Sequence, residues 1–245
     1  MHRQLLCLLF LTICTGCGSS VYRPAQTAGF ALDPASEIDD DDIAKAFAAR
    51  PQLPEEVHVS YFSFDEKRAP TLAKTVAASS KVTGSYEIPS LLVTGKGRLD
   101  EEPMYPPAPA QAPSIKQLRL LAARAHSDVL VIFDYGHRVT SQPNALLATS
   151  ILLIPAFFVP MTDYEIESYL DTYVIDVKNG YLYAHISSQA RDVEDYESVF
   201  SDVDQEILED QWKRIEQETR SKLDKVLADP ELRLPAKAQV ASDKP

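Results

Sequence analysis

Apolar and polar residues alternate along several short stretches of the chain, which is the period of a β-strand. Residues 56–64 show this alternation, with Val57, Val59 and Tyr61 on one side and His58 and Ser60 on the other. Residues 86–94 form a second stretch of this kind. Residues 129–135 are almost continuously apolar, which is typical of a strand buried at the centre of a sheet.

Apolar residues at steps of three and four predict helices over 36–50, 70–80, 114–126 and 198–227. Ser36 and Ser114 are suitable N-caps for the first and third of these helices. The acidic run 39–42 lies at the start of the first helix, where its charge matches the helix dipole. A calcium loop is the alternative interpretation, but it needs alternating oxygen ligands and a glycine at the bend, which this run lacks.

Asn179-Gly180 is a preferred pair for a two-residue hairpin turn. It separates two strand-like stretches, 164–177 and 181–187. If Lys178 pairs with Tyr181, the register places Tyr173 opposite Ile186 on an apolar face and His185 on the other face. We therefore predict a β-hairpin with one face in the core.

The order of elements is strand, helix, strand, helix, strand, hairpin and long C-terminal helix. A β-α-β-α-β order implies crossover connections and mixed pairing, so we predict a single α/β (mixed α+β) domain over residues 37–228 with a mixed sheet. A Pro-rich loop, 103–113, interrupts this domain. The polar residues 229–245 are expected to form a disordered tail.

The first sixteen residues have the features of an export signal. A short basic start, Met1-His2-Arg3-Gln4, precedes the apolar run 5–13, and Thr15-Gly16-Cys17 follows. This segment resembles a bacterial lipoprotein signal, although Cys14 stands where an aliphatic residue is usual. The resemblance implies cleavage before Cys17 and acylation of that residue. An ordinary cleaved signal peptide is one alternative, and a single spanning anchor is another, although the apolar run is shorter than the roughly 20 residues that a bilayer requires.

The residues around Cys17 also indicate a location in the cell. Gly18 follows the cysteine, and in enteric-type bacteria the resemblance implies sorting to the outer membrane. Residues 17–36 are expected to form a lipidated, flexible tether. Cys7, Cys14 and Cys17 are the three cysteines of the chain, so an exported domain would contain no disulfide and no thiol nucleophile. A formal net charge of −12 disfavours binding to nucleic acid.

The element order also resembles that of the small α/β domains at the start of TolB and in the curli secretion lipoprotein. This similarity covers residues 55–228 and has no signature motif, so we transfer no pore and no site residue from it. It implies only that a secretion or pore component is one possible class for this protein.

Residues with catalytic chemistry are few. Asp134 and His137 are expected just beyond the carboxyl end of the central strand, where α/β folds commonly bind ligands. A polar strand end that meets solvent is the plainer interpretation. No metal-ligand spacing and no cofactor motif are present, and we predict no cofactor.

Two apolar or aromatic regions could contact a partner. Residues 145–161 are the most apolar stretch after the signal, and Pro155 would break a spanning helix there. This stretch either closes the core or exposes Phe157 and Phe158 to a membrane or a protein. Tyr181 and Tyr183 on the hairpin could form a recognition face, although ordinary strand composition also explains them.

These observations predict a membrane-anchored envelope lipoprotein that is not an enzyme. We expect it to contact the membrane through lipid on Cys17, to bind a protein partner in the envelope and to act as an assembly or accessory factor. The alternatives are a ligand-binding or hydrolytic enzyme that uses Asp134 and His137, and a secretion or pore component.

Overall fold

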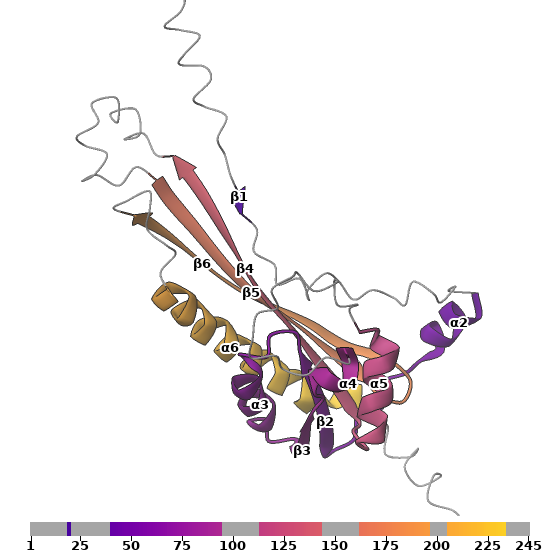
Figure 1. Ribbon diagram of the computed structural model, residues 1–245. Helices are drawn as coiled ribbons and strands as arrows, with labels where there is room; N and C mark the ends of the chain where they lie inside the picture. The colour runs from indigo at the N-terminus through magenta and orange to yellow at the C-terminus, as the bar shows by residue number, and fades with distance from the viewer. Residues whose placement is uncertain (1–18, 21–39, 95–112, 144–161, 197–204, 234–245) are drawn as a thin grey trace, which may run out of the picture. The chain divides into compact units, whose positions relative to one another are not determined.

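The computed structural model describes residues 19–20, 40–94, 113–143, 162–196 and 205–233. Its strands form a sheet in the order β3-β2-β4-β5-β6, and the short strand β1 (Ser19–Ser20) pairs with β4 (Figure 1). Their bounds are β2 Val57–Ser63, β3 Val82–Glu87, β4 Val129–Pro143, β5 Thr162–Asp176 and β6 Leu182–Tyr196. β2 runs parallel to both β3 and β4. The predicted mixed α/β class, with a hairpin and a long C-terminal helix, is confirmed.

The chain divides into two compact units. Unit 1 comprises residues 1–22, 137–168 and 190–212, and unit 2 comprises residues 23–136, 169–189 and 213–245. The strands β4, β5 and β6 and the helix α6 (Gln205–Ala228) contribute residues to both units. Each unit is described by itself.

Unit 2 contains the helices α2 (Asp40–Ala48), α3 (Ala69–Ala77), α4 (Ser90–Thr94) and α5 (Ile115–Arg124). On one face of the sheet, Leu118 and Ala122 of α5 pack with Leu130 and Ile132 of β4 in a buried cluster. Ser114 and Gln117 form a reciprocal capping box that starts α5 at the predicted residue.

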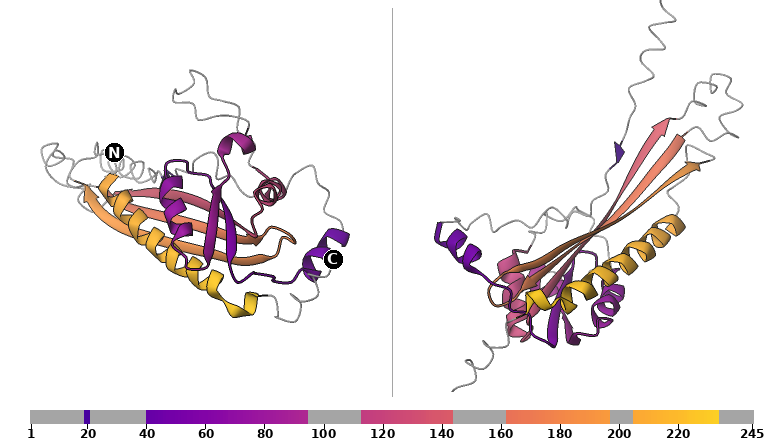
Figure 2. Two further views of the ribbon diagram at one scale, coloured as in Figure 1. Left: turned by 90° about the horizontal axis from the view of Figure 1, so that it is seen from below. Right: turned by 180° about the vertical axis from the view of Figure 1, so that it is seen from behind.

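The opposite face of β4 is also covered. Val129, Val131 and Phe133 point there because side chains alternate along a strand, and all three are fully buried. The helices α3 and α6 form this layer (Figure 2). Ser79, just after α3, donates a hydrogen bond to Asp224 of α6 at 2.6 Å. A strand buried on both faces explains why its sequence is continuously apolar.

The part of α6 in unit 2 buries a stripe at helical spacing. Its members are Ile215, Thr219, Leu223 and Leu227. Thr219 and Ser188 of β6 form a side-chain hydrogen bond of 3.0 Å within this stripe. The amphipathic pattern that predicted this helix therefore marks its core face.

In unit 1, the helix α6 takes part in a buried polar contact. Gln211 of α6 lies at hydrogen-bond distance from Ser168 and donates its amide to the carbonyl of Ile166 at 2.8 Å and to Asp192 at 2.8 Å. In the same unit, Ser19 of β1 lies opposite Thr140 of β4. Residues 19–20 belong to the range that was expected to be a tether.

Two further predicted elements, a strand and the C-terminal tail, differ from the structure. The strand expected over 86–94 is wrong: β3 covers Val82–Glu87, and residues 90–94 form α4. Pro89 explains the break because it lacks a backbone N–H and favours the first turn of a helix. Residues 230–232 form a 3₁₀ helix, and Arg233 bridges to Leu53, so order extends into the range expected as a tail.

The predicted hairpin register is also wrong. The N–H of Asp176 donates to the carbonyl of Tyr181 at 2.8 Å and the N–H of Gly180 donates to the carbonyl of Asp176 at 3.0 Å. The loop therefore spans residues 177–180, and of the predicted turn pair only Gly180 has a positive φ, +76°. As a result, Tyr173 stacks on His185 rather than facing Ile186.

Several expectations concern residues outside the described ranges: acylation of Cys17, the Pro-rich loop, and the apolar stretch 145–161 with Phe157 and Phe158. No helix among the described residues is both long and apolar enough to cross a membrane.

Candidate functional site

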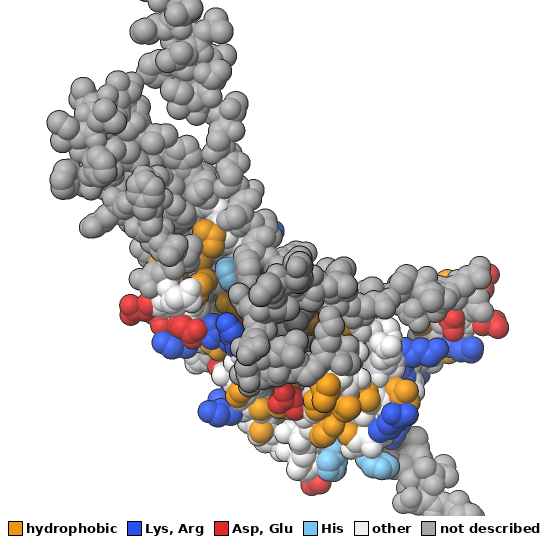
Figure 3. Space-filling view, viewed as in Figure 1, with side chains coloured by type: hydrophobic (Ala, Val, Ile, Leu, Met, Phe, Trp, Pro, Cys, Tyr) orange, Lys and Arg blue, Asp and Glu red, His pale blue; other side chains and the backbone are white. Residues whose placement is uncertain are grey.

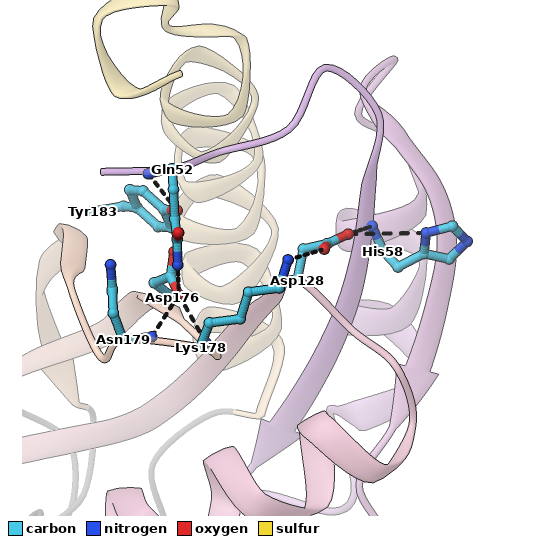
Figure 4. Close-up of polar contacts among 7 residues, drawn as sticks. All are labelled: Gln52, His58, Asp128, Asp176, Lys178, Asn179 and Tyr183. Atoms are coloured by element: carbon cyan, nitrogen blue, oxygen red, sulfur yellow. Dashed lines mark hydrogen bonds and ion pairs between the residues drawn. The ribbon is translucent and has the colours of Figure 1, made fainter. Parts of the chain in front are cut away.

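Asp176, at the end of β5, is the centre of a polar network in unit 2. Its side chain is buried and accepts four hydrogen bonds (Figure 4). Oδ1 accepts from the backbone N–H groups of Lys178 at 2.8 Å and Asn179 at 3.0 Å, and from Nε2 of Gln52 at 3.1 Å. Oδ2 accepts from the hydroxyl of Tyr183 at 2.6 Å.

These four bonds occupy most of the acceptor capacity of the carboxylate. Burial, the hydrogen bond to Asp176 and the charge of Asp176 together raise the pKa of Tyr183 well above its ordinary value, in that order of importance. The same hydroxyl accepts from the N–H of Gln52 at 3.4 Å. Asp176 therefore fixes the 177–180 loop and the segment before β2, and it is poorly placed to act as a base.

Asp128 joins the start of β4 to two neighbours. Its Oδ2 accepts from the N–H of His58 at 3.2 Å, and its Oδ1 lies 3.9 Å from Nζ of Lys178. The backbone continues the link, because the carbonyl of Asp128 accepts from the N–H of Val177 at 3.0 Å. The ring of His58 is 4.0 Å from the carboxylate and 60% exposed, so this is a surface contact between strand ends.

A shallow hollow of about 500 Å³ lies beside this network. Its wall is formed by the end of α2, the following segment and the hairpin loop: Lys45, Ala48, Ala49, Arg50, Pro51, Gln52 and Asn179. Asn179 holds it in shape by donating Nδ2 to the carbonyl of Arg50 at 2.8 Å. Two exposed cations and two amides suit an anionic group, but both amides are already engaged inside the protein.

A second polar group lies on the sheet face that carries α5. Nε2 of His185 is 3.0 Å from Oδ1 of Asp171, and the ring of Tyr173 stacks on His185 at 4.5 Å between centroids. The pKa of Tyr173 is raised first by burial and then by the charges of Asp171 and Asp134. Asp134 therefore belongs to the surroundings of Tyr173.

The sequence placed Asp134 and His137 beyond a strand end, whereas both lie inside β4, which continues to Pro143. Residues three apart on a strand point to opposite faces, so the two do not form a pair. Sequence reasoning missed Asp171 and His185, because the wrong hairpin register put them on different faces. Within the described parts of the chain, no group of three or more His, Cys, Asp or Glu side chains could hold a metal ion.

The two hairpin tyrosines are close, with ring centroids 5.6 Å apart in an edge-to-face arrangement. Tyr183 is buried and its hydroxyl is turned to Asp176, while Tyr181 is half-buried. Of this predicted recognition pair, Tyr183 is therefore part of the protein interior, and Tyr181 keeps part of its surface in contact with solvent.

Comparison with known proteins gives no family. No protein-family model matches the chain, and no curated protein matches it. The hypothetical protein CT253 from Chlamydia trachomatis is similar over 71% of this chain and 98% of its own, with a TM-score of 0.40 and 11% identity. The lipoprotein GNA1162 from Neisseria meningitidis is similar over 69% and 99%, with a TM-score of 0.27 and 14% identity.

A nucleoside-triphosphatase / dITP/XTP pyrophosphatase from Mycobacterium abscessus is similar over 56% of this chain and 72% of its own, with a TM-score of 0.25 and 12% identity. One neighbour is thus a bacterial lipoprotein and another is a nucleotide hydrolase. At these TM-scores neither bears on what this chain does.

Proposed function

We propose that this protein is a lipoprotein of the bacterial envelope, anchored through lipid on Cys17, that works through protein contacts as an assembly or accessory factor and not as an enzyme. The observation that carries the proposal is the order of the first residues: an apolar run over 5–13, a small residue, and then Cys17, the last cysteine of the chain. Gly18 favours the outer membrane as the destination.

The polar groups described above support the non-enzymatic part of the proposal. The carboxylate of Asp176 already accepts four hydrogen bonds from its own fold, and Asp134 and His137 point to opposite faces of β4. By contrast, the helix α2 exposes Ile43 and Phe47, with 59% and 84% of their surfaces accessible. Exposed apolar side chains on one helix face suit a protein contact.

Acylation can be tested with a matched pair of cysteine variants. Cells that express the Cys17→Ser chain should incorporate no labelled palmitate into it, and the protein should leave the membrane fraction. The control Cys14→Leu should keep both label and membrane attachment, because it restores the aliphatic residue usual at that position. Palmitate on the Cys17→Ser chain would show that the anchor is assigned to the wrong residue.

The absence of catalysis at β4 is tested separately. A strain that lacks the gene should be complemented equally well by the parental chain and by a chain with Asp134→Asn and His137→Ala. Failure of that double variant, at normal abundance and melting temperature, would support the enzyme alternative.

A further inference from the structure

The surface formed by α4 and α5 is basic and apolar, although the protein is acidic. Residues 88–94 and 113–127 contain no Asp or Glu, in a chain that has 36 acidic residues. We call the exposed part of this surface the α4–α5 face; it consists of Leu91, Leu92, Lys116, Leu120 and Arg124. The three leucines are 53%, 55% and 54% exposed.

We treat these side chains as one surface because both helices pack against one core cluster. Lys116, Leu120 and Arg124 follow one another at steps of four on α5, so they share a stripe. Val93 of α4 and Leu121 of α5 pack against the same core cluster, which holds the two helices together. Figure 3 shows an apolar patch with basic side chains at its border where Figure 1 draws these helices.

Lys116 and Arg124 carry the positive charge of the α4–α5 face. Among the described residues, no ion pair involves Lys116 or Arg124. One acidic side chain, Glu66, borders the face, where it accepts a hydrogen bond from Ser90 at the start of α4. The face therefore suits a partner that carries both acidic and apolar side chains.

The helix α2 has the complementary composition. None of its residues is buried, and its first turn contains Asp40, Asp41 and Asp42. Asp40, Ile43 and Phe47 are spaced by three and four residues, so an acidic group and two apolar groups lie along one stripe. At about 1.5 Å per residue this stripe is about 10 Å long, close to the length of about 12 Å from Lys116 to Arg124.

We infer that α2 of one copy of the protein docks on the α4–α5 face of a second copy. Ile43 and Phe47 lie against Leu91, Leu92 and Leu120 in this arrangement, and the acidic first turn lies against the basic side chains. The contact joins two different surfaces, so it is heterologous and leaves one of each surface unoccupied in a dimer. The inference rests on the part of the proposed function that assigns the protein a role in protein contacts. It does not depend on acylation of Cys17.

Disulfide trapping tests the contact directly. A full-length chain with Cys7→Ser, Cys14→Ser and Cys17→Ser has no other thiol. Two such chains with different tags, one carrying Phe47→Cys and the other Leu120→Cys, are mixed and oxidised. We expect a cross-linked heterodimer to form at least tenfold faster than in a control with Val193→Cys in place of Leu120→Cys. Equal rates for the two pairs would overturn the inference.

Charge reversal then tests whether the acidic first turn of α2 is the group that contacts the α4–α5 face. Lys116→Glu with Arg124→Glu on the Leu120→Cys chain should slow trapping at least tenfold, and so should Asp40→Lys with Asp41→Lys on the Phe47→Cys chain. Mixing the two reversed chains should restore the parental rate, whereas Lys45→Glu with Arg50→Glu should not change it. All these side chains are exposed, so melting temperatures should be unaffected.

Failure of the reversed chains to rescue one another would overturn the inference. A second outcome would also overturn it: the α4–α5 face binds an acidic protein or anionic vesicles, while the Phe47→Cys chain forms no disulfide with the Leu120→Cys chain. Because these chains lack Cys17, the outcome is independent of the palmitate experiment.

Discussion

The parallel centre of the sheet and its hairpin end differ in what determines their structure. Val129 to Phe133 at the start of β4 are buried on both faces, and β2 beside them is buried at every position except His58. In β5, buried Leu170, Thr172 and Val174 alternate with half-buried residues, and the strand ends on the four bonds of Asp176. Many apolar contacts hold the centre, whereas one carboxylate sets the geometry of the hairpin loop.

The largest effect is expected at the centre. Phe133→Ala should lower the free energy of unfolding by about 3–5 kcal/mol, because it removes a fully buried ring and leaves a cavity. Chemical denaturation would measure this loss. Val193→Ala is the control, since Val193 is 62% exposed, and it should cost less than about 0.5 kcal/mol. Similar losses for the two variants would mean that the centre does not dominate stability.

The next effect is expected at the hairpin end. Asp176→Ala leaves three N–H donors and the hydroxyl of Tyr183 without their acceptor, and it should cost about 2–4 kcal/mol if some donors reach water. Asp176→Asn keeps one carbonyl acceptor and should recover part of this loss. Amide hydrogen exchange should speed up at residues 177–181 in the alanine variant. Unchanged exchange there would contradict the role given to Asp176.

A smaller effect is expected from the backbone of the loop. Gly180 has φ +76°, and a Cβ there would lie 2.8 Å from Nη1 of Arg119, which binds the carbonyl of Val177 at 2.9 Å through Nη2. Gly180→Val should therefore lower stability by about 1–3 kcal/mol. Lys178→Val, in the same loop, is the control and should cost less. A melting temperature that does not change in Gly180→Val would contradict the left-handed conformation.

The smallest effect is expected from the phenol of Tyr183. Tyr183→Phe should cost about 1 kcal/mol at neutral pH, because it removes the hydrogen bond to Asp176 and the longer one from the N–H of Gln52. The raised pKa of Tyr183 means that the folded state keeps its proton above about pH 10, where the unfolded chain loses it. Stability should therefore fall as pH rises through this range, more steeply in the parental protein than in Tyr183→Phe. Parallel pH profiles would show that the phenol is not shielded.

The same comparison explains how much could be predicted from sequence. The centre was predicted almost completely because a continuous apolar run has one stable location, between two layers. The helices α5 and α6 were also predicted, since caps and helical spacing are local signals. β3 was misplaced because its sequence, Val-Thr-Gly-Ser-Tyr-Glu, is mostly exposed at the sheet edge and has little apolar pattern.

The polar groups were less predictable because they depend on register. A shift of one residue on β6 moved His185 to the face of Tyr173 and Asp171. Likewise, no local signal showed that β4 continues past Asp134 to Pro143. The acceptor role of Asp176 depends on Gln52, which is 124 residues away in sequence, so no short motif could have indicated it.

The pairing of β1 with β4 has a consequence for attachment. Ser19 lies opposite Thr140, and only Gly18 separates Ser19 from Cys17. At about 3.4 Å per residue, an acylated Cys17 would be held within about 7 Å of a hydrogen-bonded position. Residues 21–39 come after this pairing in the sequence, so they would not lie between the lipid and β1. With Cys17 acylated, unit 1 would lie next to the bilayer surface. A spacer inserted after Gly18 would be needed to increase the distance between them.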